Sequence, residues 1–365
     1  MPKTKDIRSL MLPHMLDAIP YAAVDPPSVL AARAGIPEDD IAKLDANENP
    51  YGPSPKVAEA LASYKGYHIY PDPQQRRVRE VLASYADTTP ERIVSGVGSD
   101  ELIDLLLRLF VAPGDRVINC VPTFGMYASF VSVVGGELVP VLRSETFDVD
   151  MEGIRKAARK GAKVIFLASP NNPTGNLVAE ATVRQLLELD MVVVVDEAYY
   201  EFASTTLAPL VPQYSNLVVL RTFSKWAGLA GIRLGYGIMD PVIAERLMVV
   251  KPPYNLSVAA EVALLASLDD KALLLSRVQS IVAERESLFA HLRQIPGLVP
   301  LPSRANFILC RLPRGQGHRV YQELARRGIF VRYYDMPLLR DYIRVSVGLP
   351  HQSKALVEAL QTILV

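Results

Sequence analysis

The chain has little cysteine, no net charge and no long apolar run, and each absence excludes a class of protein. Only two cysteines occur among 365 residues, Cys120 and Cys310, both in apolar stretches. We therefore expect buried thiols in a reducing, cytoplasmic compartment rather than a disulfide. Lysine plus arginine equals aspartate plus glutamate at 39 each, which provides no electrostatic surface for nucleic acid or an anionic membrane. No apolar run approaches the roughly 18 residues of a membrane span, and the N-terminal residues lack a signal-peptide apolar region. The five histidines are scattered without metal-ligand spacing, so no metal is expected.

The chain is long enough for two domains, and half of its residues are hydrophobic. Residues 1–46 are rich in proline, which resists helix and strand, and their apolar anchors predict an irregular, extended arm on a folded surface. Residues 47–255 alternate short valine- and isoleucine-rich strands with helices, which predicts a mostly parallel sheet covered on both faces. The strand candidates are 93–94, 116–121, 137–142, 163–168, 191–195, 217–220 and 235–239. Residues 256–292 read as helix with little interruption, and they open a smaller α+β domain, 256–365.

The most informative stretch is 220–236, where a strand candidate gives way to hydroxyls, glycines, one lysine and one arginine. Lys225 alone would ordinarily be a solvated loop charge. The glycines around it leave the backbone bare for close approach to a ligand. Thr222, Ser224 and Arg233 can all donate hydrogen bonds to a phosphate. A lysine amine beside an anion site suggests a Schiff base with a phosphorylated aldehyde, of which pyridoxal phosphate is the common one.

Further polar and aromatic residues follow the ends of other strand candidates. Asp196 ends a run of four valines, at the position where ligands bind in open α/β sheets, although it could instead cap a helix. Its carboxylate would suit a protonated pyridine nitrogen. Tyr199 and Asn172 could bond the ring hydroxyl, and Phe124 could cover the ring face. For Asn172 and Phe124 an ordinary turn and an ordinary core position are the alternatives.

The segment Gly96 to Glu101, GVGSDE, follows a strand candidate and opens a helix, which is the setting of a dinucleotide fingerprint. The third glycine of that fingerprint is missing, because Glu101 stands at its position. The segment still offers a glycine-rich helix N-terminus whose N–H groups can bind a phosphate. A simple turn is the alternative.

Two arginines, Arg332 and Arg344, stand inside strand candidates late in the chain. An arginine there is costly unless it is paired or faces a ligand. A guanidinium suits carboxylate and phosphate because it offers a planar fork of donors. A structural ion pair is the alternative for each.

Together these motifs resemble the fold-type I pyridoxal-phosphate aminotransferases and, within them, the histidinol-phosphate aminotransferase family. The motifs in chain order are NENPYG, YPDP, GSDE, PTFGMY, SPNNPTG, VDEAY, TFSKWAGLAGIRLG and VRYYDMPLLRDYIRVSVG. They extend from about Tyr21 to Val347. The resemblance implies an α/β fold with a mostly parallel seven-stranded sheet and a smaller C-terminal α+β domain. It also implies pyridoxal 5'-phosphate as cofactor and a homodimer with shared active sites.

The resemblance also implies a role for each site residue. Lys225 would carry the cofactor and shuttle the proton, Asp196 would pair with the pyridine nitrogen, and Phe124 would stack on the ring without the hydroxyl that many relatives have. The residues implied for the ring oxygen are Tyr199 and Asn172, and those for the cofactor phosphate are Ser99, Asp100, Thr222 or Ser224, Arg233 and, reaching across from the partner subunit, Tyr70. The residues implied for the substrate are Tyr21, from either subunit, Asn49, Arg332 and Arg344.

The implied reaction is transamination of L-histidinol phosphate with 2-oxoglutarate, in histidine biosynthesis. An aromatic amino-acid aminotransferase and a phosphothreonine decarboxylase of the same fold are the alternatives within this class. The alternative of a nicotinamide oxidoreductase is supported by GVGSDE alone, and it leaves Lys225 without a role. A pyridoxal-phosphate sensing module without catalysis differs from all of these by having no turnover.

Overall fold

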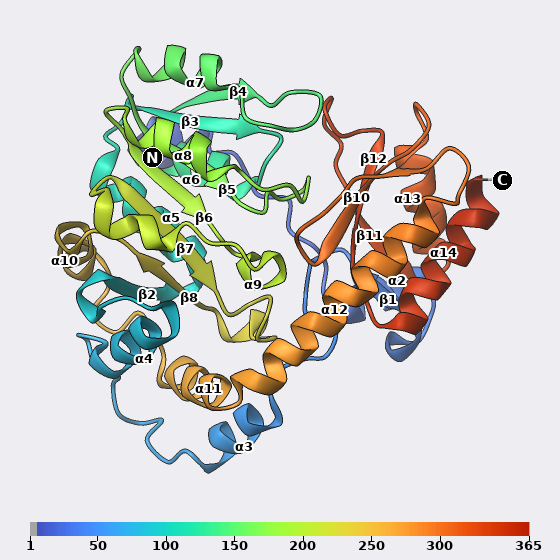
Figure 1. Ribbon diagram of the computed structural model, residues 1–365, viewed down its shortest axis with the longest axis horizontal. Coiled ribbons are helices and arrows are strands. Elements are labelled where there is room, and N and C mark those ends of the chain that lie inside the picture. The colour runs from blue at the N-terminus through green and yellow to red at the C-terminus, as the bar shows by residue number, and fades with distance from the viewer. Residues whose placement is uncertain (1–5, 365) are drawn as a thin grey trace, which may run out of the picture.

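The computed structural model describes residues 6–364, which form two β-sheets with helices packed on them (Figure 1). The strands of the larger sheet are β2 (Ile93–Val97), β3 (Arg116–Val121), β4 (Glu137–Leu142), β5 (Ala162–Ala168), β6 (Val192–Asp196), β7 (Leu217–Thr222) and β8 (Leu234–Ile238). They lie in the order β2-β8-β7-β6-β5-β3-β4. Every neighbouring pair is parallel except the two that involve β8. The expected mostly parallel, seven-stranded sheet is therefore confirmed.

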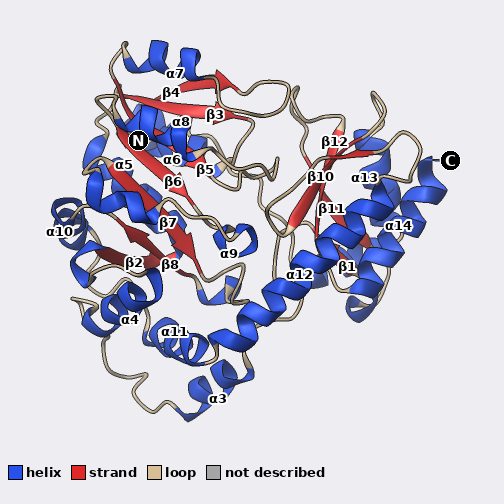
Figure 2. Cartoon of the chain, viewed as in Figure 1, coloured by secondary structure: helices blue, strands red, loops and turns tan. Residues whose placement is uncertain are grey.

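Helices lie on both faces of the larger sheet (Figure 2). The helices of this part of the chain are α3 (Pro55–Ser63), α4 (Arg76–Ala86), α5 (Gly98–Phe110), α6 (Met126–Val133), α7 (Met151–Ala158), α8 (Glu180–Leu187), α9 (Tyr200–Ala203), α10 (Pro241–Val250) and α11 (Val258–Asp269), and α3 packs against α11. Alternate valines of β6 enter opposite cores, since Val193 and Val195 pack on one side and Val194 on the other. Successive side chains of a strand point to opposite faces, so a sheet covered on both faces needs an unbroken apolar run.

The smaller sheet has the strand order β1-β11-β12-β10-β9. Its strands are β1 (Ala42–Leu44), β9 (Val299–Pro300), β10 (Phe307–Arg311), β11 (Ile329–Tyr333) and β12 (Tyr342–Ser346), and its helices are α2 (Pro27–Ala34), α12 (Lys271–Leu292), α13 (Gly317–Arg326) and α14 (Pro350–Leu364). Helix α12 runs from one sheet to the other (Figure 1). Leu274 and Val278 of α12 pack in the core of the larger sheet, whereas Leu288 and Leu292 pack in that of the smaller sheet. One continuous helix therefore joins both halves.

The N-terminal region is more regular than its prolines predicted. Residues 13–16 and 27–34 form the helices α1 (Pro13–Leu16) and α2, each with proline at its start, where the missing N–H is not needed. Strand β1 pairs in parallel with β11 and so completes the smaller sheet. The expectation of an irregular arm is wrong for these segments. The domain boundaries at residues 46 and 255 stay predictions.

The helix expected from 256 to 292 is divided at Asp270, between α11 and α12. Asp270 leaves the helical conformation at φ −112° and ψ 26°. Its carboxylate accepts a hydrogen bond from the Ser54 hydroxyl, which ties the break to the N-terminus of α3. Among residues 6–364, neither these helices nor any other combines the length and apolarity of a membrane-spanning segment.

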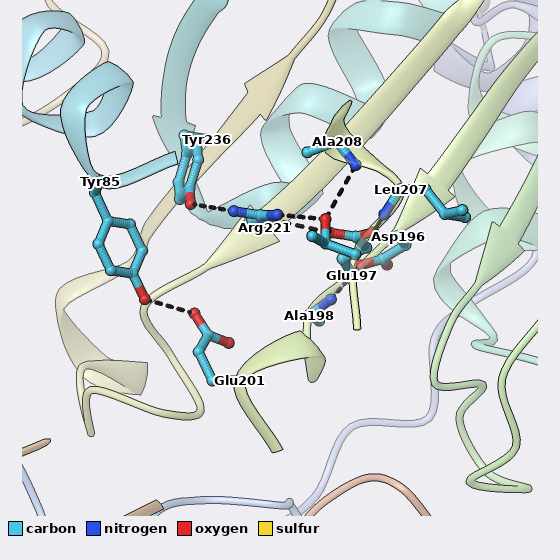
Figure 3. A network of polar contacts seen from close by, with 10 residues as sticks. Tyr85, Asp196, Glu197, Ala198, Glu201, Leu207, Ala208, Arg221 and Tyr236 are labelled. Carbon is cyan, nitrogen blue, oxygen red and sulfur yellow. Dashed lines mark hydrogen bonds and ion pairs between the residues drawn. The ribbon is translucent and has the colours of Figure 1, made fainter. Parts of the chain in front are cut away.

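A buried ion pair lies beneath the strand ends of the larger sheet (Figure 3). The Arg221 Nε on β7 donates to Glu197 Oε2 at 3.0 Å, and both side chains are at most 3% exposed. Glu197 also accepts from the Leu207 N–H at 2.6 Å and from the Thr206 hydroxyl at 2.7 Å. Arg221 lies over the Tyr200 ring, 3.7 Å from its centroid. Burial raises the pKa of Glu197 although Arg221 acts in the opposite direction, so the carboxylate depends on its cation.

We predict that Arg221→Met lowers the free energy of unfolding by about 3–5 kcal/mol, because it leaves Glu197 as a buried charge without its partner. Adding Glu197→Gln should recover part of that loss, because the side chain is then neutral, its oxygen can still accept from the Leu207 N–H, and its NH2 group can donate to the Thr206 hydroxyl. The control is Arg246→Met, which breaks an exposed pair with Glu245 and should change stability by no more than about 0.5 kcal/mol. Urea unfolding of the four proteins is the measurement. Equal losses in the single and double variants would contradict the charge argument.

Candidate active site

A cavity of about 650 Å³ lies where β5, β6 and β7 end, and residues of the smaller sheet close it. It lies at the carboxyl edge of the parallel strands, where open α/β sheets bind ligands. Of the residues predicted from the sequence, those that line it are Tyr21, Ser99, Asp100, Phe124, Asn172, Asp196, Tyr199, Thr222, Ser224, Lys225, Arg233, Arg332 and Arg344. The fold thus brings together residues that are far apart in the sequence.

Lys225 lies just after β7 in the wall of this cavity. Its Nζ donates to the carbonyl oxygen of Ala46 at 3.0 Å. Burial and, secondly, the positive charge of Arg344 lower the pKa of the Lys225 amine to about 8. Both effects disfavour the protonated form. The unprotonated, nucleophilic form of this amine is therefore far more populated near neutral pH than that of an ordinary lysine.

Asp196 ends β6 and is buried in the cavity floor. Its Oδ2 accepts a hydrogen bond from the Tyr127 hydroxyl at 2.8 Å, and its Oδ1 accepts one from the Ala198 N–H at 3.1 Å. Burial raises the pKa of the carboxyl to about 6, against these two hydrogen bonds. The helix α9 begins only at Tyr200, so Asp196 caps a local turn rather than that helix. A cation beside this carboxylate would lower its pKa again.

Sequence reasoning missed Tyr127, the partner of Asp196. It lies one helical turn after Phe124 on α6, and its ring packs edge-on to Phe124 with 5.5 Å between centroids. The motif PTFGMY contains both aromatic residues, so a helical period of three to four was the available signal. Tyr127 is fully buried, which raises the pKa of its phenol well above the usual value and keeps it a donor.

The ring-hydroxyl candidates also form hydrogen bonds with other parts of the cavity. The Tyr199 hydroxyl accepts from Asn47 Nδ2 at 2.9 Å. Asn172 Oδ1 accepts from Arg344 Nη1 at 2.7 Å, which joins the turn after β5 to β12. Burial raises the pKa of Tyr199, so it stays a phenol. Asn47, which also lines the cavity, was missed as a site residue.

The start of α5 has the shape and the donors of an anion site. Gly98 opens the helix with φ +77°, and the first N–H groups of a helix have no partner within it. A Cβ on Gly235 of β8 would lie only 2.3 Å from the Ser99 nitrogen, so only glycine allows this approach. Arg233 Nη2 is 3.1 Å from Asp100 Oδ2 at the same turn. The donor set fits a phosphate.

Two hydroxyls complete this end of the cavity. Thr222 Oγ1 donates to the Ser224 hydroxyl at 2.9 Å and accepts from the Ser224 N–H at 3.1 Å. Both side chains are buried in the wall between β7 and Lys225. They can turn toward a phosphate because hydroxyl hydrogens rotate freely.

The opposite end of the cavity carries two arginines on one face of the smaller sheet. Arg332 of β11 and Arg344 of β12 are direct cross-strand partners. Arg344 Nη2 donates to the Asp45 carbonyl, and Arg332 Nη2 donates to the Ala22 carbonyl. Arg344 Nε is buried and has no hydrogen-bond partner among residues 6–364. A buried donor without an acceptor is costly, so this end suits an anionic ligand.

Two predicted site residues lie outside the cavity lining of their own chain. Asn49 is buried, and its Nδ2 donates to the Trp226 carbonyl at 2.8 Å while its Oδ1 accepts from the Tyr51 N–H at 3.0 Å. Its amide is thus used in the NENPYG turn, and Asn47 takes the position in the cavity that we expected for Asn49. Tyr70 is 77% exposed and stacks on Tyr254. Its reach to a partner subunit stays a prediction.

Comparison with known proteins places this fold and site in a class of enzymes. The family model described as Aminotransferase class I and II matches residues 39–362. A solved structure, the histidinol-phosphate aminotransferase of Sinorhizobium meliloti in complex with pyridoxal-5'-phosphate, superposes with a TM-score of 0.88 at 28% identity and covers 98% of each chain. The expected fold-type I architecture and pyridoxal 5'-phosphate as cofactor are confirmed.

Curated relatives show to which family within this class the chain belongs. The chain is 50% identical to the histidinol-phosphate aminotransferase of Roseiflexus castenholzii, over 98% of this chain and 99% of the relative. It is 45% identical to the chloroplastic enzyme of the same name from Nicotiana plumbaginifolia, over 96% of this chain and 85% of the relative. The chain therefore belongs to the class I and II aminotransferases and, within them, to the histidinol-phosphate aminotransferase family.

We predict that the apoprotein captures pyridoxal phosphate on Lys225 at a rate that rises with pH and levels off above about 8. Only the unprotonated amine attacks an aldehyde, and its fraction grows as pH rises through the pKa. Borohydride reduction followed by peptide mapping measures the label. Lys163→Ala, at an exposed lysine, is the control and should capture normally, whereas Lys225→Ala should not. A midpoint near the ordinary lysine value of about 10.4 would contradict the burial effect.

Proposed function

We propose that this chain transfers the amino group of L-histidinol phosphate to 2-oxoglutarate, giving imidazole acetol phosphate and glutamate. The observation that carries the proposal is one cavity whose lining combines Lys225 with the neighbouring arginines Arg332 and Arg344. The relatives at 44–50% identity support the choice of substrate. A donor of this kind carries a phosphate and an amine but no carboxylate.

The residues present fit pyridoxal phosphate at one end of the cavity. When bound, this cofactor supplies an aldehyde for the amino group and a pyridine ring that takes up electrons. The start of α5, Thr222, Ser224 and Arg233 would hold its phosphate. Phe124 would cover one ring face, and Tyr199 would bond the ring oxygen.

Two titratable groups of the chain would manage protons in the reaction. Asp196 would hold a proton on the pyridine nitrogen of the cofactor, because a buried carboxylate is stabilised by a cation next to it. Lys225 Nζ, with its lowered pKa, removes the proton from the substrate carbon that bears the amine and later returns a proton. Asp196 ends β6 and Lys225 follows the neighbouring strand β7, so both groups lie at the same edge of the sheet.

The arginine pair serves both half-reactions. Arg344, with a free buried Nε, offers a fork for a carboxylate of 2-oxoglutarate. Arg332 adds a second cation for the phosphate dianion of the donor. Charge-assisted hydrogen bonds of this kind contribute about 1.5–3 kcal/mol each. An aromatic amino acid would use Arg344 for its carboxylate and leave Arg332 without an anion.

We predict that kcat/KM is highest for L-histidinol phosphate, and that loss of its phosphate costs roughly tenfold to a hundredfold per lost contact. Arg332→Ala should reduce kcat/KM for histidinol phosphate far more than for histidinol or phenylalanine. The matched control is Arg311→Ala, because Arg311 is an exposed arginine on β10 of the same sheet. If phenylalanine is the best donor, the aromatic aminotransferase takes the place of this proposal. Equal losses of kcat/KM for all three donors would show that Arg332 does not recognise the phosphate of the donor.

We also propose that the working unit is a homodimer with shared active sites. Tyr70 is exposed, and its ring stacks on Tyr254 with 4.5 Å between centroids. Ile69, Tyr67 and Tyr254 are also at least 46% exposed. Such clustering of aromatic and apolar side chains is typical of a protein contact surface. The YPDP loop that carries Tyr70 therefore suits contact with a second copy of the chain.

We predict that mixing inactive Tyr70→Ala subunits with inactive Lys225→Ala subunits restores part of the activity. One of the two sites in each hybrid dimer would contain both intact residues. Size-exclusion chromatography of differently tagged subunits establishes that exchange has occurred. If exchange is proven and no activity returns, the sites are not shared through Tyr70.

A further inference from the structure

Glu101, which takes the place of the third glycine in GVGSDE, has a structural role that the dinucleotide pattern does not explain. Its Oε2 accepts a hydrogen bond from the Val97 N–H at 2.7 Å and another from Asn255 Nδ2 at 2.8 Å. The carboxylate lies against Gly96, where a Cβ would be 3.0 Å from Oε2. The glycine therefore leaves room for the glutamate, and the glutamate holds the backbone at the end of β2.

Asn255 is in turn fixed by a network that reaches two other segments. Its Nδ2 also donates to the Ser95 carbonyl at 3.2 Å, and its Oδ1 accepts from Gln75 Nε2 at 3.0 Å. Gln75 is buried and exchanges two further hydrogen bonds of 3.0 Å with the Ser95 backbone. The carboxylate of Glu101 is thus held in place from β2, from the start of α4 and from the loop before α11.

This network ends at the turn that faces the cavity. Val97 is the residue before α5, so the bond from its N–H to Glu101 spans the first turn of that helix. The N–H groups of Ser99 and Asp100 lie inside the span, and both residues line the cavity. Glu101, Asn255 and Gln75 do not line the cavity. An acid in the first helical turn is also favoured by the helix dipole.

We propose that Glu101 is a positioning residue for the cofactor phosphate: it fixes the Val97–Gly98 backbone so that the N–H groups that follow point into the cavity. It acts through the turn and does not touch the ligand. The inference rests on the proposed pyridoxal-phosphate-dependent function. It assigns the Glu101–Asn255 pair a purpose in cofactor retention rather than in substrate choice.

The test compares two substitutions of similar size at this position. Glu101→Gln keeps an oxygen that accepts from both the Val97 N–H and Asn255 Nδ2, whereas Glu101→Met has none. Titration of each apoprotein with pyridoxal phosphate, followed by the absorbance of the bound cofactor, gives the dissociation constant. We expect Glu101→Met to raise it about tenfold or more and Glu101→Gln to leave it within about threefold. At saturating cofactor, kcat of Glu101→Met should be close to that of the parent.

A general loss of stability is distinguished by Asn216→Leu. Asn216 Nδ2 donates to the carbonyls of Leu187 and Met191 at 3.1 and 3.0 Å, where β6 and β7 begin, at the opposite end of these strands from the cavity. This control should lower the melting temperature without changing the dissociation constant. The inference is overturned if Glu101→Met binds the cofactor like the parent, or if Asn216→Leu weakens binding equally. Failure of the parent to use histidinol phosphate would refute the proposed donor and leave this binding result standing.

Discussion

The site depends on the burial of the Asp196 carboxylate. A carboxylate that loses its water is costly unless hydrogen bonds or a cation compensate. Tyr127 and the Ala198 N–H supply two hydrogen bonds, yet burial still holds the pKa at about 6. The Asp196 carboxylate would therefore be stabilised further by a positive charge in the cavity. The cavity floor is thereby matched to a ligand that carries a proton on a ring nitrogen.

The same low-polarity setting acts in the opposite direction on Lys225. Its pKa falls because its ammonium is desolvated and because Arg344 approaches from the smaller sheet. Arg344 is held there by Asn172 Oδ1 and by the Asp45 carbonyl. The hydrogen bond from Arg344 to Asn172 also links the two sheets. The packing of the two sheets thus affects the reactivity of the lysine, since the arginine that shifts it belongs to the other half of the chain.

The sequence allowed the larger sheet and most of the cavity to be predicted, for a physical reason. A parallel strand buried on both faces is an apolar run, so a polar residue at its carboxyl end is conspicuous, as Asp196 and Lys225 are. Tyr127 escaped notice because a tyrosine on a helix resembles an ordinary core residue. Strand β1 was missed because three residues carry little periodicity and form a strand only through pairing with β11. The contribution of Glu101 depends on Asn255, which is distant in the sequence.

Asn47 shows why a motif can be identified while its key residue is misassigned. It is buried with φ +54°, a left-handed conformation that asparagine tolerates better than most residues. Its N–H donates to the Ser346 hydroxyl at 2.8 Å, that hydroxyl donates to its Oδ1 at 2.9 Å, and its carbonyl accepts from Asn306 at 3.0 Å. Its Nδ2 donates to Tyr199 in the cavity.

Every polar group of Asn47 is thus used, and the residue joins the smaller sheet to the wall of the site. Aspartate would keep the acceptor and lose the donor to Tyr199, and glycine would keep the conformation and lose both. Asn49, two residues further along, is equally polar in the sequence, but its amide forms hydrogen bonds within its own turn and with the carbonyl of Trp226. The difference between the two asparagines is set by partners from β12 and from the segment after β6, and those partners are brought to NENPYG only when both sheets have formed.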